Sequence, residues 1–91
     1  MRRIERRLFQ LNDEISALRR DEQLAEEELI FHQHLNDDAA RDAAVSDSPL
    51  DRADARETAS DVARFELHIA KLRRSREKLE SQRDRLVRKL R

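Results

Sequence analysis

Three histidines are the residues of this sequence that first suggest chemistry, because imidazole is a common metal ligand. His32 and His34 are two positions apart, and His68 approaches them if the chain folds back on itself. On a helix, residues two positions apart point about 200° away from each other, so His32 and His34 cannot bind one ion. The sequence also lacks a Glu-x-x-His pair of the kind that holds two metal ions in helical bundles. We therefore expect no metal ion, and we interpret His32 as a spacer between helices.

Other catalytic chemistry also lacks the residue types that it needs. The 91 residues include no cysteine and no glycine. Without cysteine there is no disulfide, thiol nucleophile or thiolate metal ligand, and without glycine there is no glycine-rich phosphate loop. Serine, histidine and aspartate are present, but no pattern brings them into one pocket. We predict that the protein is not an enzyme.

The composition instead indicates long helices. Charged residues make up 44% of the chain, aromatic residues make up 3%, and there is a single proline. Along each half of the sequence one stripe recurs in alternating steps of four and three residues, which is the seam of a coiled coil. The first seam passes through Ile4, Leu8, Leu11, Ile15, Leu18, Glu22, Ala25, Leu29, His32, Asn36, Ala39 and Ala43. The second seam passes through Ala55, Thr58, Val62, Phe65, Ile69, Leu72, Arg76, Leu79, Arg83, Leu86 and Leu90.

One short break separates the two seams. Ser48 precedes Pro49, which predicts a helix start with Ser48 as N-cap and the proline at the first helical position. Because a proline disfavours helical geometry in the residue before it, the first helix should end near Val45. We predict a helix over about residues 3–45, a turn over 46–49 and a second helix over about 50–90. So short a connection makes the helices antiparallel, and the chain is then a single all-α domain, an antiparallel two-helix coiled-coil hairpin.

Folding the chain at this break also predicts the register of the two helices. Leu18 then falls opposite Leu79, and His32 falls opposite Phe65. The polar interruptions of the two seams coincide, because Glu22 falls opposite Arg76. An acid and a base in one layer of an apolar seam fix register and orientation, so we predict that Glu22 and Arg76 form a register pair.

Apolar residues outside the seam are the candidates for binding a partner. Five large ones gather near the middle of the two predicted helices: Leu24, Ile30, Phe31, Leu35 and Leu67. The predicted register places Leu67 and Ala70 beside the first four. Either these residues widen the core under long Arg and Lys side chains, or another helix docks on them. We expect the second arrangement, in which a second copy pairs through this region and the homodimer is a four-helix bundle.

The charged residues are sorted along the hairpin although the net charge is zero. Residues 36–61 carry eight acids and three arginines, whereas residues 62–91 carry eleven bases and four acids. The turn is therefore acidic, with Asp47, Asp51 and Asp54 at its tip. The basic end makes nucleic-acid binding an open alternative, although it lacks the aromatic residues that stack on bases. The residues that such a basic rod would use are Arg73, Arg74, Arg83, Arg85 and Arg88.

A segment of the first predicted helix is similar to part of a known family of helical hairpins. Residues 15–20 read Ile-Ser-Ala-Leu-Arg-Arg, and Glu-Glu-Glu-Leu-Ile-Phe follows at 26–31. This pattern resembles the actinobacterial anti-sigma hairpin that responds to cyclic di-GMP, whose nucleotide motif is Glu-x3-Ser-x2-Arg-x3-Gln-x3-Asp. Glu26 matches the first motif position, and the other four are occupied by Ile30, Gln33, Asp37 and Arg41. The resemblance therefore implies binding of a sigma factor without the nucleotide, although cyclic di-GMP is the one ligand that it leaves open.

The predicted turn carries a second resemblance. Residues 47–54 read Asp-Ser-Pro-Leu-Asp-Arg-Ala-Asp. They are similar to the acidic coiled-coil tips of the secondary-channel factors of RNA polymerase, of the Gre and DksA type. In that family the carboxylates reach toward the catalytic magnesium, and a further globular or zinc-binding domain is present, which we do not expect in this chain.

Together these features predict a cytoplasmic, homodimeric, non-enzymatic protein-interaction module. The most specific hypothesis is a transcription regulator of anti-sigma or sigma-binding type. The alternatives are an RNA polymerase secondary-channel binder, a structural coiled coil and a basic rod that binds nucleic acid. We expect no signal peptide and no membrane span, because no continuous apolar segment follows the basic residues at the start.

Overall fold

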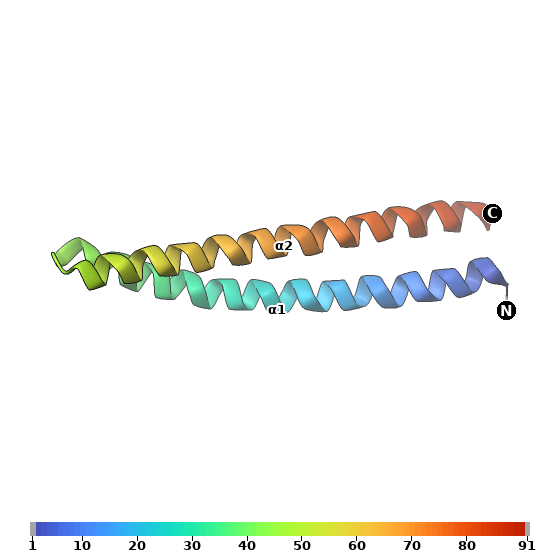
Figure 1. Cartoon of the computed structure of the whole chain (residues 1–91). Coiled ribbons are helices and arrows are strands. Elements are labelled where there is room, and N and C mark those ends of the chain that lie inside the picture. The colour runs from blue at the N-terminus through green and yellow to red at the C-terminus, as the bar shows by residue number, and fades with distance from the viewer. Residues whose placement is uncertain (1, 91) are drawn as a thin grey trace. The chain divides into compact units, whose positions relative to one another are not determined.

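The computed structural model describes residues 2–90, which form two α-helices and no strand (Figure 1). Helix α1 spans Arg3–Val45 and helix α2 spans Pro49–Lys89. The fold is the antiparallel all-α hairpin predicted from the sequence, and each helix boundary lies within one residue of its predicted place. In the part of the chain that the structure describes, neither helix has an apolar stretch able to cross a bilayer.

The connection between the helices consists of three residues whose polar groups form hydrogen bonds with residues close to them in the sequence. The backbone N–H of Ser48 donates to the Ser46 hydroxyl oxygen at 3.0 Å. The Ser48 carbonyl accepts the first hydrogen bond of α2, from the Arg52 N–H at 3.3 Å. Ser48 therefore occupies the N-cap position and Pro49 the first helical position, where its missing N–H leaves no helical bond unmade.

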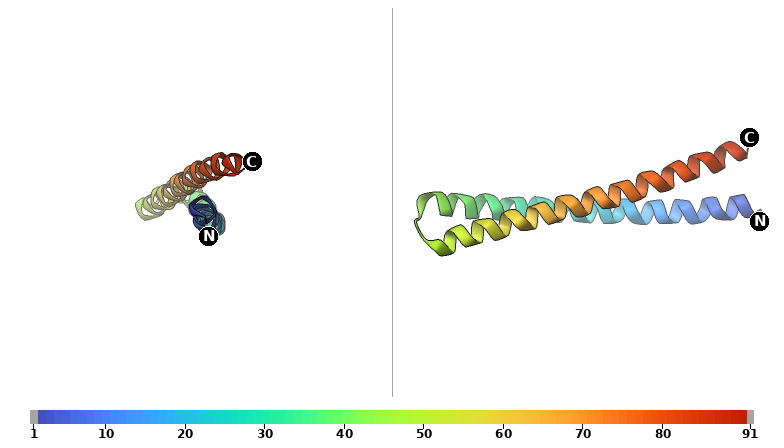
Figure 2. Two further views of the ribbon diagram at one scale, coloured as in Figure 1. Left: turned by 90° about the vertical axis from the view of Figure 1, so that its right-hand side faces the viewer. Right: turned by 45° about the horizontal axis from the view of Figure 1, so that its top comes forward.

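The hairpin divides into two compact units, each of which contains part of both helices. The connection unit is Leu24–Ile69, and the terminal unit contains α1 up to Gln23 together with α2 from Ala70 onward. Within each unit the two helices lie side by side (Figure 2).

The core of the terminal unit is one layer of seam residues. Leu11 is fully buried, Ile15 is almost so, and the carboxylate residue Glu22 is buried among them. The partly exposed seam residues of α2 in this unit are Leu72, Arg76, Leu79, Arg83 and Leu86. Leu90, predicted to close the seam, is 47% exposed because α2 ends at Lys89.

The core of the connection unit follows the predicted seam more loosely. Ala25 and Ile69 are buried. Beyond them the His32 ring stacks on Phe65, with ring centroids 4.6 Å apart. Closer to the turn the Thr58 hydroxyl donates to Asn36 Oδ1 at 2.9 Å, so a polar pair replaces an apolar layer there. These contacts confirm the predicted seam face of both helices.

The core is small for a chain of this size. Among the described residues, four hydrophobic side chains are buried, namely Leu11, Ile15, Ala25 and Ile69. The chain exposes 6949 Å² of surface, whereas a compact monomer of 10.8 kDa exposes about 5,500 Å². The hairpin thus exposes about 1,400 Å² more than a compact monomer of its mass would.

Because so few side chains are buried, each of them should contribute strongly to stability. We expect Leu11→Ala to lower the free energy of unfolding by about 2–5 kcal/mol, since it leaves a cavity between the helices. Urea denaturation followed by circular dichroism, at one fixed protein concentration, measures the change. The exposed neighbour Asn12 provides the control, and Asn12→Ala should change stability by less than about 0.5 kcal/mol. Equal losses in the two variants would contradict the assignment of Leu11 to the core.

Candidate interaction surface

Four apolar side chains of α1 in the connection unit point away from α2. Leu24, Ile30, Phe31 and Leu35 are 40–61% exposed. They are exposed because Ala25, Leu29 and His32 already occupy the seam, and one helix can turn only one stripe toward a single neighbour. We call these four residues the α1 apolar face.

Part of the α1 apolar face lines a shallow groove of about 510 Å³. Ile30, Phe31 and Leu35 form its apolar floor, and the remaining lining residues are Glu27, His34 and Asp38. The groove therefore combines apolar surface with carboxylates, which suits a segment that is itself apolar and positively charged.

The surroundings of this groove are strongly acidic. From Leu24 to Val45, α1 carries six acids and one arginine, a net charge of −5. That arginine, Arg41, forms an ion pair with Asp38. No other base on this stretch of α1 is available to neutralise the acids or to lie over the apolar side chains.

Aromatic rings connect the α1 apolar face to α2. The rings of Phe31 and His32 meet edge to face with centroids 5.6 Å apart, and His32 stacks in turn on Phe65. Beside Phe65 lies a shallow pocket of about 260 Å³ that Arg64 and His68 also line. The apolar surface of the connection unit thus extends from Phe31 through two further rings to α2.

Leu67 does not belong to this surface, although the sequence analysis placed it there. It is 53% exposed, but Phe65 contacts His32 and Ile69 is buried. Residues two positions from Leu67 on either side therefore face α1, so Leu67 points away from α1. Ala70 belongs to the terminal unit and is partly exposed.

The terminal unit has a basic groove of about 280 Å³ lined by both helices. Arg7, Arg85 and Lys89 supply its positive charge, and Leu86 and Gln82 complete the lining. The Arg7 guanidinium donates to Gln82 Oε1 at 3.4 Å, which joins α1 to α2 across the groove. The sequence pattern pointed to Arg85 but not to Gln82, because the approach of Gln82 to Arg7 depends on the local register.

Phe9 is an exposed apolar residue that the sequence reasoning missed. It lies in the terminal unit, follows the seam residue Leu8 and is 58% exposed. The signal was present, since Phe9 falls outside the seam just as Phe31 does. It was overlooked because no other apolar residue outside the seam lies near it in the sequence.

The acidic tip is spread over the connection and the first turns of α2. Asp47 lies in the connection and is exposed, as is Asp54, while Asp51 is partly covered. The Arg52 guanidinium donates to the Asp47 carbonyl oxygen at 2.9 Å. The positive Arg52 side chain thus folds back over this tip. Among the described residues, we observe no contact that brings the three carboxylates together around one point.

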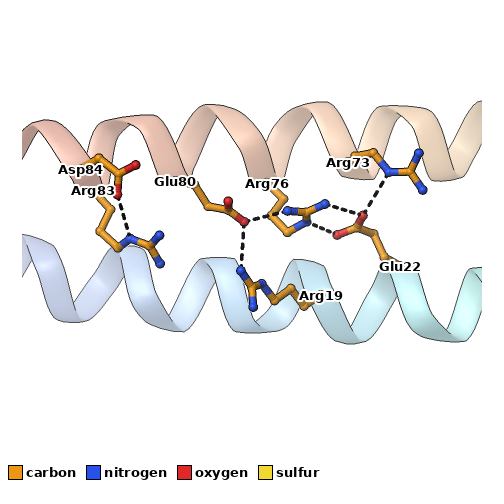
Figure 3. Close-up of polar contacts among 7 residues, drawn as sticks. All are labelled: Arg19, Glu22, Arg73, Arg76, Glu80, Arg83 and Asp84. Atoms are coloured by element: carbon orange, nitrogen blue, oxygen red, sulfur yellow. Dashed lines mark hydrogen bonds and ion pairs between the residues drawn. The ribbon is translucent and has the colours of Figure 1, made fainter.

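The predicted register pair is the centre of a charged network in the terminal unit (Figure 3). Arg76 Nε donates to Glu22 Oε2 at 2.5 Å, and Arg76 Nη2 donates to Glu22 Oε1 at 3.2 Å. Arg76 Nη1 also donates to Glu80 Oε1 at 2.7 Å. Arg19 reaches the same Glu80 oxygen from α1 at 3.3 Å, and Arg73 Nε lies 3.8 Å from Glu22.

This network shifts the ionisation of two of its members. The hydrogen bonds that Arg76 donates to Glu22, and next the one that it donates to Glu80, raise the pKa of Arg76 above its ordinary value, so the guanidinium stays charged. The hydrogen bond from Arg76 lowers the pKa of Glu80 below its ordinary value, and the hydrogen bond from Arg19 adds to this effect. Both shifts favour the ion pairs that hold α1 against α2.

The three histidines form no metal site with their surroundings. Among the described residues, no group of three or more His, Cys, Asp or Glu side chains is arranged to hold an ion. His32 instead contacts Phe31 and Phe65.

No protein-family model, curated protein or solved structure matches the chain. The sigma-factor and RNA polymerase hypotheses therefore rest on the sequence resemblances, and the geometry above carries the functional argument.

Acidification should weaken the charged network through Glu80. A carboxylate with a lowered pKa stabilises the fold above its unfolded value, which is near 4.5, and loses that contribution as the pH falls toward its folded pKa. We expect Glu80→Gln to have a lower melting temperature than the wild type at pH 7, and we expect this difference to shrink below pH 4.5. Thermal melts of both proteins across the pH range measure it.

Glu77 provides the matched control for this test, because it is an exposed glutamate in the same part of α2. Glu77→Gln removes the same charge without removing a partner of Arg76. If the two variants lose stability equally at pH 7, the network does not hold the helices together.

Proposed function

We propose that this protein is a non-enzymatic protein-interaction module that binds a protein partner through the α1 apolar face. The observation that carries this proposal is the exposure of Leu24, Ile30, Phe31 and Leu35 on one short stretch of α1. Complete burial of one Leu, Ile or Phe side chain contributes about 1.5–3 kcal/mol. Four such residues on one stretch supply the apolar centre that a specific interface needs.

The charges around these residues argue against a merely widened core. In that arrangement the long stems of Lys and Arg side chains would cover the apolar residues. On α1 from Leu24 to Val45 the one such side chain is Arg41, and it is paired with Asp38. The stretch of α1 from Leu24 to Val45 thus has no further Lys or Arg side chain that could cover the α1 apolar face.

The specific partner suggested by the sequence resemblance is a sigma factor. Its helical domains would meet the α1 apolar face as an amphipathic helix meets a groove. A regulatory role in transcription would follow from occupying a surface that the sigma factor otherwise uses. This part of the proposal rests on the resemblance and on the exposed face together.

The proposal is tested by comparing what the chain captures with and without the apolar face. The tagged full chain, Phe31→Glu and Gln33→Glu are each incubated with a lysate of the native cells, and bound proteins are identified by mass spectrometry. Phe31→Glu places a charge in the apolar centre and should reduce recovery of the partner at least about ten-fold, in line with interface centres.

Gln33→Glu is the matched control, because Gln33 is exposed and its substitution adds the same charge outside the α1 apolar face. It should leave recovery unchanged. A sigma factor in the captured set would support the transcription role. Equal recovery by Phe31→Glu and by the wild type would show that the α1 apolar face is not the binding surface.

A further inference from the structure

We infer that the occupant of the α1 apolar face is a second copy of this chain, which presents the basic groove of its terminal unit to that face. Two copies would then pair in antiparallel orientation, with the connection unit of each against the terminal unit of the other. This inference rests on the proposed function, since it names what covers the same surface when no other protein partner is bound.

The first support is the opposite charge of the two units. Residues 24–69 carry twelve acids and four arginines, a net charge of −8. The rest of the chain carries sixteen bases and eight acids, a net charge of +8. A connection unit therefore finds on a second copy a unit of equal and opposite charge, and such complementarity selects both partner and orientation.

The second support is the composition of the two grooves. On one side, Glu27 and Asp38 line the groove whose floor is Ile30, Phe31 and Leu35. On the other side, Arg7, Arg85 and Lys89 surround Leu86. Each groove thus pairs apolar surface with charges of a single sign, and the signs are opposite.

The same charges disfavour the alternative in which two α1 apolar faces meet each other. That arrangement brings two stretches of −5 together, with Glu27 and Asp38 of each copy close to acids of the other. Like charges across an interface cost free energy and suppress wrong pairings. The antiparallel arrangement avoids this repulsion and remains two-fold symmetric, because each contact is repeated with the copies exchanged.

The third support is the amount of surface left exposed. The chain exposes 6949 Å², about 1,400 Å² more than a compact monomer of its mass. A stable interface buries about 800 Å² on each partner. The area that each chain would lose to such an interface is therefore smaller than the area by which the chain exceeds a compact monomer.

The test uses charge reversal on each groove and then mixes the variants. The acid-reversed variant is Glu27→Lys with Asp38→Lys, and the base-reversed variant is Arg85→Glu with Lys89→Glu. All four residues are exposed, so the substitutions leave the seam intact, and circular dichroism checks that each chain remains helical. Analytical ultracentrifugation of the purified full chains measures the dimer dissociation constant.

In the antiparallel dimer, each variant alone places like charges at both contacts. We expect each to dimerise at least about ten-fold more weakly than the wild type. An equimolar mixture restores opposite charges at both contacts, so it should form a heterodimer within about three-fold of the wild-type dissociation constant. The wild-type dimer should also weaken at least about ten-fold between low salt and 0.5 M salt, because exposed charges are screened.

Two results would overturn the inference and leave the proposed function separately testable. If the base-reversed variant dimerises as tightly as the wild type, the copies meet through their connection units instead. If the wild type remains monomeric at high concentration, no second copy occupies the face. A partner captured from lysate in a Phe31-dependent way would then still support the proposed function, with a different protein as occupant.

Discussion

A helix can bury only one stripe of its surface against a single neighbouring helix, and this limit governs the structure. Two helices therefore share a core that is one layer of side chains deep. Leu11, Ile15, Ala25 and Ile69 fill that layer in the described chain. Among the described residues, every other large apolar side chain lies at the edge of this layer or outside it, so the interaction surface follows directly from the small size of the core.

The charged network compensates in part for the small number of buried apolar side chains. Glu22 is buried in the seam, where an unpaired carboxylate would destabilise the fold. Two hydrogen bonds from Arg76 satisfy it, and Glu80, which accepts from both Arg76 and Arg19, adds a further link between α1 and α2. An apolar layer tolerates a shift of one helix along the other, whereas this pair is satisfied in one register. Specificity at this layer therefore comes from the ion pairs, while the free energy of association comes from the apolar layers around them.

The sequence predicted the helices well because their signals are local or periodic. The single proline after Ser48 marks the break, and the seam spacing identifies the face of each helix that is turned inward. The sequence predicted the candidate surface less completely. The register placed Leu67 close to the candidate surface. However, Phe65 and Ile69 face α1, so Leu67 lies on the side of α2 that faces away from α1. The basic groove was missed in part because Arg7 and Gln82 are far apart in the sequence and meet only through packing.

The order in which contacts can form differs along the hairpin. Thr58 and Asn36 are separated by 22 positions, Arg76 and Glu22 by 54, and Arg7 and Gln82 by 75. Closing a longer loop costs more entropy, so contacts near the turn form most readily. During synthesis on the ribosome, Arg7 can form this contact only after Gln82 has emerged, because Gln82 lies on one of the last turns of α2. The N-terminal arm of the hairpin is thus the first part of the chain to be made and among the last to acquire its tertiary contacts.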